Sequence, residues 1–123
     1  MELNVLTEKI LACAYKVHTE LGPGLLEGAY EECLHYELLH AGLVVSRQKT
    51  LPLIYCEIKM DAGYRIDLLV ENRVIIELKA VESFTDVHVA QVLTYLKLSG
   101  CKVGLLLNFN VTSLKNGIKR LMN

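Results

Sequence analysis

The stretch RIDLLVENRVIIELKA, residues 65–80, decides the fold. Two strongly apolar runs lie on either side of the turn residues ENR, which predicts two strands of a hairpin, 62–70 and 74–80. Both alternating sets of side chains in the second run are largely apolar, so we expect a strand covered on both faces. Asp67, Glu77 and Lys79 interrupt the two runs. A charged group in such a place must be paired, hydrogen-bonded or bound to a metal.

The length of the turn decides whether the two acids meet. A two-residue turn points Asp67 away from Glu77, whereas a three-residue turn over 71–73 places them opposite each other. Opposed carboxylates about 5 Å apart repel by about 3 kcal/mol at an effective dielectric constant of 20. Mg²⁺ or Mn²⁺ would offset that repulsion. The alternative is an ion pair, Asp67 with Lys79 or Arg65 with Glu77, and the spacing of the charges leaves both readings open.

The segments around the hairpin predict an α/β chain with one domain, residues 1–123. Apolar periodicity and stop residues indicate helices at 5–20, 25–40, 86–99 and from 112 or 113 toward 121, and strands at 44–54 and 102–109. The order is ααβββαβα. The strand, helix and strand within 74–109 have the spacing of a right-handed crossover, which predicts a mixed sheet.

Two further polar positions are candidates for a site. His88, Gln91 and Tyr95 form a second stripe on helix 86–99, for which a solvated helix face is the alternative. Glu27 lies at the start of helix 25–40, where a carboxylate also complements the helix N-terminus.

The composition excludes several classes of protein. No apolar run is long enough to cross a bilayer, and the start MELNVLTEKI lacks a secretion signal. We therefore expect a cytoplasmic protein that is not associated with a membrane. The four cysteines are widely spaced and are expected to be reduced thiols. The net charge of −1 does not by itself indicate nucleic acid, but residues 1–40 carry −5 and residues 41–123 carry +4. A basic face is therefore expected.

Two motifs resemble a known family. Gly24, Glu27 and Tyr30 in GLLEGAY resemble the signature of the GxxExxY proteins, and RIDLLVENRVIIELKAVESFTDVHVAQVLTYLK resembles the later part of the same family. That family belongs to the PD-(D/E)XK nuclease superfamily, and the likeness covers nearly the whole chain. The resemblance implies a restriction-endonuclease-like αβββαβ core, with a mixed central sheet flanked by helices. Ile66 stands where superfamily motifs often have Pro.

The resemblance also implies a site and an activity. Asp67, Glu77 and the backbone carbonyl of Leu78 would bind Mg²⁺ or Mn²⁺, with Glu27 binding directly or through water. Lys79, Gln91 and Tyr95 would complete a catalytic site for hydrolysis of phosphodiester bonds in nucleic acid, DNA in preference to RNA. A homodimer is left open. The alternatives are a nucleic-acid-binding module that cleaves poorly and a homo-oligomeric interaction domain.

A polyanionic substrate also needs positive charge near carboxylates that repel it. Some members of one set of basic residues are therefore expected to flank the site: Arg47, Lys49, Lys59, Arg65, Lys97 and Lys102.

Overall fold

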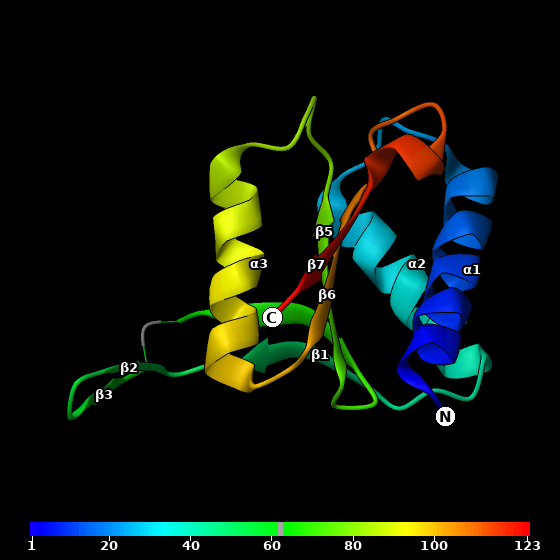
Figure 1. Ribbon diagram of the computed structural model, residues 1–123. Helices are drawn as coiled ribbons and strands as arrows, with labels where there is room; N and C mark the ends of the chain where they lie inside the picture. Colours follow the sequence, from blue (N-terminus) through cyan, green and yellow to red (C-terminus); the bar gives the residue numbers. More distant parts are fainter. Residues whose placement is uncertain (62) are drawn as a thin grey trace.

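The computed structural model describes residues 1–61 and 63–123. A five-stranded sheet lies between α1 and α2 on one face and α3 on the other (Figure 1). The elements in chain order are α1 (Leu3–Leu21), α2 (Glu27–His40), β1 (Val45–Thr50), β2 (Leu53–Tyr55), β3 (Ile58–Met60), β4 (Arg65–Val70), β5 (Val74–Lys79), α3 (Asp86–Ser99), β6 (Val103–Asn108), the 3₁₀ helix η1 (Leu114–Gly117) and β7 (Ile118–Met122). The α/β class and the helix-flanked sheet are as predicted.

The sheet is mixed, with the strand order β1-β4-β5-β6-β7. Strands β5 and β6 are parallel and α3 connects them, whereas the other neighbouring pairs are antiparallel. The parallel pairing predicted for the strand, helix and strand of residues 74–109 is confirmed.

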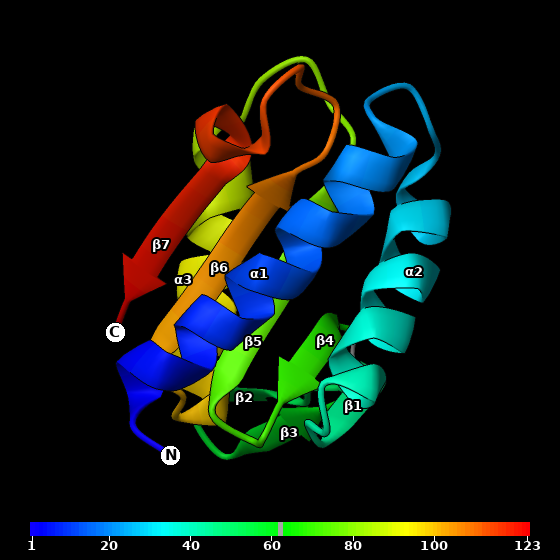
Figure 2. The same cartoon turned by 90° about the vertical axis from the view of Figure 1, so that its right-hand side faces the viewer.

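Both faces of the sheet are covered by helices. Leu68, Ile76 and Leu78 face a core shared with α1 and α2, which lie side by side across that face (Figure 2). On the other face, Ile75 packs with Val92 of α3. Burial of all but the last residue of β5 explains why its sequence is apolar on both sides. Among the described residues, none of the helices is long and apolar enough to cross a bilayer.

Local hydrogen bonds define the ends of two helices. At the start of α3, the Thr85 hydroxyl accepts from the His88 N–H at 3.3 Å, and His88 Nδ1 accepts from the Thr85 N–H at 3.1 Å. His88, predicted in the polar stripe, therefore caps the helix. Before α2, the Tyr30 hydroxyl donates to the Gly22 carbonyl at 2.6 Å and accepts from the Leu25 N–H at 3.1 Å. The tyrosine of the GLLEGAY motif thus fixes the loop between α1 and α2.

The predicted last helix, from 112 or 113 toward 121, is wrong. The chain instead forms the short helix η1 and then β7, which pairs antiparallel with β6. A β-carbon on Gly117 would lie 2.2 Å from the backbone oxygen of Asn108, so the chain passes too close to β6 for any other residue. Pairing of β7 covers a strand edge that would otherwise be left open.

The predicted strand 44–54 is also wrong in its extent. It divides into β1 and β2 around Pro52, which has no N–H to give to a ladder. Strand β2 pairs with β3, which lies between the predicted strands 44–54 and 62–70, where no strand was expected. The next predicted strand, 62–70, begins at Arg65 instead, and residue 62 lies outside the described residues.

Candidate active site

The turn between β4 and β5 has three residues. Val70 pairs with Val74, so residues 71–73 form the turn. Glu71 and Asn72 both have a φ of 53°, and the Arg73 N–H donates to the Val70 carbonyl at 2.9 Å. Arg73 is the extra residue that sets the register. Of the two turns open from the sequence, the structure has the one that places Asp67 opposite Glu77.

Asp67 and Glu77 are in direct contact where regular pairing of β4 and β5 ends. The backbone N–H of Asp67 donates to Glu77 Oε1 at 3.2 Å, and Asp67 Oδ2 accepts from the Leu78 N–H at 3.0 Å. Side-chain oxygens therefore accept hydrogen bonds from these two N–H groups, where backbone carbonyls would accept them in a regular strand pairing. The N–H and C=O of one residue in a strand point to the same side, so the Leu78 carbonyl is directed toward β4 as well.

Burial and the neighbouring charge keep Glu77 protonated. Its side chain is 3% exposed. The pKa of Glu77 is raised to about 9, mainly by burial and then by the charge of Asp67. The charge of Lys79 lowers this pKa by a smaller amount. At neutral pH the Asp67–Glu77 pair consequently carries one negative charge instead of two.

Helix α3 brings two of the predicted residues to this pair. Gln91 Nε2 donates to the Tyr95 hydroxyl at 3.1 Å. Burial and then the charges of Glu77 and Asp67 raise the pKa of Tyr95. Tyr95 packs in the same buried cluster as Ile66 and Ile75, which adjoin Asp67 in β4 and precede Glu77 by two residues in β5.

The ion pairs considered as the alternative are not formed. Within residues 1–61 and 63–123, no ion pair joins Asp67 to Lys79 or Arg65 to Glu77. The ion pairs of this part of the chain are Lys16 with Glu37 at 3.1 Å and Arg47 with Glu31 at 2.7 Å.

Helix α2 reaches the pair through a residue that the sequence analysis did not select. Glu27, the first residue of α2, is exposed, and no hydrogen bond joins it to Asp67 or Glu77 among the described residues. Glu31, one turn later, is 8% exposed and accepts from Gln48 Nε2 at 2.7 Å. The same Gln48 nitrogen lies 3.3 Å from Asp67 Oδ1. Gln48 therefore bridges Glu31 and Asp67.

Gln48 holds this position in an unfavourable backbone conformation. Its φ is 53°, and it lies where the pairing of β1 with β4 is interrupted, between Arg47↔Leu68 and Lys49↔Ile66. The left-handed conformation costs a residue with a side chain about 1 kcal/mol. The only signal in the sequence was the spacing of Glu27 and Glu31, one helical turn apart.

The donor atoms of the pair fit a divalent cation. Two carboxyl groups and the Leu78 carbonyl are the hard oxygen donors that Mg²⁺ and Mn²⁺ prefer. A bound cation would also favour the ionised form of Glu77, against the burial and the Asp67 charge that raise its pKa. In the part of the chain that the structure describes, three or more His, Cys, Asp or Glu side chains do not gather at any one place to hold a metal. Asp67 and Glu77 thus supply the carboxylates of the site alone.

The basic residues expected near the site are divided. Lys49 and Arg65 are exposed on β1 and β4, and Lys59 is exposed on β3. Arg47 is engaged by Glu31. Lys102 lines a cavity with Arg73 at the turn that opens β5, so it lies at the far end of that strand from Glu77.

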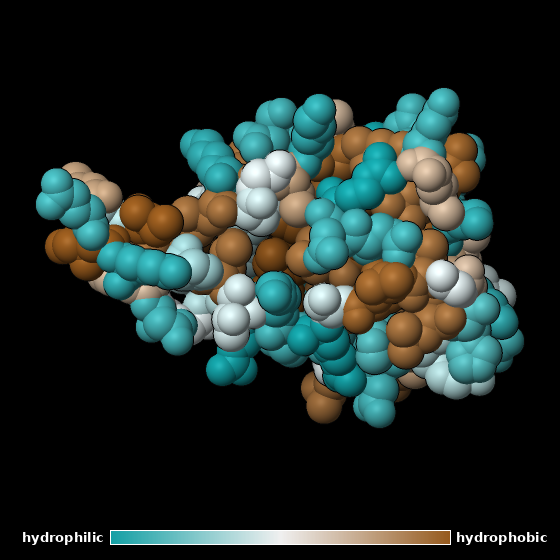
Figure 3. Space-filling view, turned by 90° about the horizontal axis from the view of Figure 1, so that it is seen from below, coloured by the Kyte–Doolittle hydropathy of each residue, from teal (hydrophilic) through white to brown (hydrophobic). Residues whose placement is uncertain are grey.

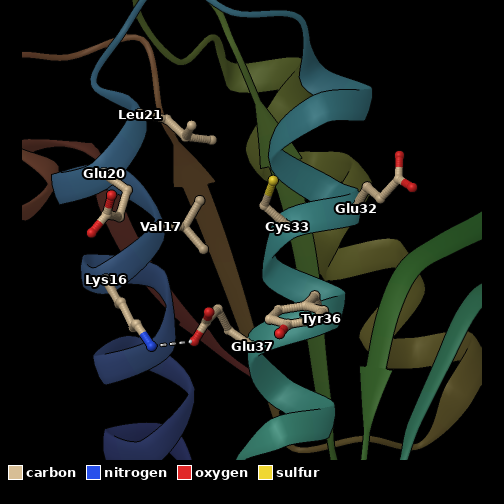
Figure 4. Close-up of a pocket in the computed structure, with 8 residues that line it drawn as sticks. All are labelled: Lys16, Val17, Glu20, Leu21, Glu32, Cys33, Tyr36 and Glu37. Carbon is tan, nitrogen blue, oxygen red and sulfur yellow. Dashed lines mark ion pairs between the residues drawn. The ribbon is translucent and has the colours of Figure 1, made fainter.

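The groove between α1 and α2 is separate from this site. It has a volume of about 390 Å³ and is lined by Lys16, Val17, Glu20, Leu21, Glu32, Cys33, Tyr36 and Glu37 (Figure 4). None of the predicted site residues lines it. A second cavity lies against α3, and the described residues that line it include Gln91 and Tyr95 but neither Asp67 nor Glu77.

Comparison with known proteins gave one match. The model of a family described as the PD-(D/E)XK nuclease superfamily matches residues 4–121. Neither the curated proteins nor the solved structures gave a match.

Proposed function

The chain belongs to the PD-(D/E)XK nuclease superfamily, and from this premise we propose that it hydrolyses phosphodiester bonds of nucleic acid, DNA in preference to RNA. The observation that carries the proposal is the contact between Asp67 and Glu77, with the pKa of Glu77 raised to about 9. A buried acid whose pKa is raised this far lowers the stability of the protein at neutral pH, and a purely structural role gives no reason for that cost.

Mg²⁺ or Mn²⁺ would be held by Asp67, Glu77 and the carbonyl of Leu78. Glu27, exposed at the start of α2, is proposed to take part only through water. A bound divalent cation lowers the pKa of water and stabilises the charge that grows on the phosphoryl oxygens.

The other side chains are proposed to position the reactants. Lys79 alternates onto the same face of β5 as Glu77, which supports a role in which its ammonium group would orient the attacking water and face the developing negative charge. The hydrogen bond from Gln91 to Tyr95 fixes the Gln91 amide, whose remaining donor and acceptor can hold water or a phosphate oxygen. Leu78 and Gln48 hold the two oxygens of Asp67 in place before substrate arrives.

A cleavage assay tests this proposal. Supercoiled plasmid and labelled single- and double-stranded oligonucleotides are incubated with the protein in Mn²⁺ or in EDTA. We expect cleavage only with Mn²⁺, loss of cleavage in Lys79→Ala and in Asp67→Asn, and full cleavage in the control Glu32→Gln on the exposed side of α2. Binding in EDTA is measured in parallel. Binding that survives without any Mn²⁺-dependent cleavage would show a nucleic-acid-binding module instead of a nuclease.

A further inference from the structure

The hairpin of β2 and β3 forms an arm that projects away from the five-stranded sheet (Figure 1). Its register pairs Leu53 with Met60, Ile54 with Lys59, and Tyr55 with Ile58. The main sheet does not include either strand, so both faces of the arm remain open over most of their length.

One face of the arm is apolar from its base to its tip. Side chains of paired residues share a face and alternate along each strand, so Leu53, Met60, Tyr55 and Ile58 lie on the same side. Tyr55 is 66% exposed and Ile58 is 58% exposed. In Figure 3 hydrophobic surface is visible on the arm. An open apolar stripe of this kind is costly in water and indicates a contact surface.

The apolar face leads to a cavity lined by two of the candidate site residues. Leu53, at the base of this face, lines a cavity of about 300 Å³ together with Tyr64, Val87, Ala90, Gln91 and Tyr95. The ring of Tyr64 meets the ring of Tyr95 edge-on, with the centroids 6.4 Å apart. Tyr95 belongs to the same buried cluster as Ile66 and Ile75, which lie next to Asp67 in β4 and two residues before Glu77 in β5. A ligand lying along the arm would therefore end beside the part of the sheet that carries the Asp67–Glu77 pair.

We propose that the arm binds the unpaired bases of a single-stranded nucleic acid and leads that strand to the Asp67–Glu77 pair. This substrate class rests on the proposed function. Aromatic and aliphatic side chains stack on the faces of bases, and those faces are reachable only when the bases are unpaired. Lys59 on the arm and Arg65 at its base are exposed and can meet the phosphates. The aromatic steps along the path are Tyr55 at the tip and Tyr64 at the cavity.

A second copy of the chain fits this surface poorly. Each strand of the arm has three residues, so one face measures roughly 10 Å by 10 Å. A stable protein interface needs about 800 Å² on each partner. A second copy placed on this face would also cover Gln91 and Tyr95.

Binding without cleavage tests the proposal. Fluorescence anisotropy in EDTA measures the affinity of the protein for a labelled single-stranded oligonucleotide and for the matching duplex. The arm variant combines Tyr55→Ala with Ile58→Ser, and the control is Tyr36→Ala on α2, where the tyrosine is 57% exposed. We expect wild type to prefer the single strand. The arm variant should lose at least about fivefold of that affinity with an unchanged melting temperature, whereas the control should bind as wild type does.

The proposal is overturned if wild type binds duplex as well as single strand, or if the arm variant keeps the wild-type affinity. Sedimentation velocity provides a further test. The proposal is also overturned if wild type is a dimer and the arm variant is a monomer. Failure of the two proposals can be told apart. Selective binding through the arm without Mn²⁺-dependent cleavage overturns only the nuclease activity. Cleavage with an unchanged strand preference in the arm variant overturns only the role of the arm.

Discussion

Replacing Glu77 with Gln tests whether this buried acid carries a proton. Gln has the shape of a protonated Glu and keeps an oxygen that can accept from the Asp67 N–H, but it has no proton to lose. In the folded protein the pKa of Glu77 is raised from its ordinary value of 4.5 to about 9. Between these two values the folded state holds one proton more than the unfolded state.

The sign and size of the effect follow from this difference. A raised folded-state pKa means that stability is fully present below pH 4.5 and falls by about 1.4 kcal/mol per pH unit until about pH 9. Glu77→Gln lacks this dependence. In chelator the variant should match wild type near pH 4.5 and exceed it by about 3 kcal/mol at pH 7.

The assay is urea denaturation in EDTA from pH 5 to pH 8, because the difference between the two proteins cancels the titration of all other groups. That difference should grow by about 4 kcal/mol over this range. The control is Glu32→Gln, at an exposed position of α2, whose profile should run parallel to that of wild type. A gap between Glu77→Gln and wild type that stays constant with pH would refute the reasoning. A Glu77→Gln variant that is less stable than wild type at pH 7 would also refute it. Either result would mean that Glu77 is ionised in the folded protein.

Asp67→Asn should leave the free energy of unfolding unchanged or raise it in chelator, because it removes the Asp67 charge that helps to raise the pKa of Glu77. It should also abolish stabilisation by Mn²⁺, which for wild type reaches about 2.7 kcal/mol at a hundredfold excess over the dissociation constant. A loss of about 3 to 5 kcal/mol for this variant in chelator would instead identify a buried structural ion pair. Lys79→Ala should keep the Mn²⁺ stabilisation, measured by thermal melts, while any cleavage is lost; loss of both would make the lysine a structural residue. Gln48→Gly should raise the melting temperature or leave it unchanged, because it relieves the left-handed backbone, yet it should weaken Mn²⁺ binding about tenfold in calorimetry because Asp67 loses a partner. Unchanged Mn²⁺ affinity would show that Gln48 does not position Asp67.

Local patterns were enough for most of the fold. The double apolar alternation of residues 74–80 predicted a strand covered on both faces, and β5 is that strand. The predicted helix 86–99 is α3, because its capping residue Thr85 and its terminal Gly100 lie directly at its two ends in the chain. The prediction of a last helix was wrong because the contact that decides this segment's structure lies outside the segment. Only the approach of Gly117 to Asn108 decides that the chain turns back along β6.

The acids of the site were predicted in the same way, but their surroundings were not. Asp67, Glu77 and Lys79 stand out as charges in apolar strands, and the need to neutralise them can be inferred from the sequence alone. The sequence left open whether the turn had two residues or three. Backbone conformations at Glu71 and Asn72 and the extra residue Arg73 decide this in the structure.

The sequence by itself determined α1, α2, β4, β5, α3 and β6, apart from their exact ends, and which acids require a partner, because periodicity and burial act within short segments. The tertiary structure alone decided which groups meet. Glu31, Gln48 and Asp67 belong to three separate elements, and their hydrogen bonds exist only because α2 and β1 lie beside β4. The approach of Leu53 and Tyr64 to Tyr95 is of the same kind. Such contacts depend on how the elements pack across the sheet, and the residue pattern of a single segment does not predict that packing.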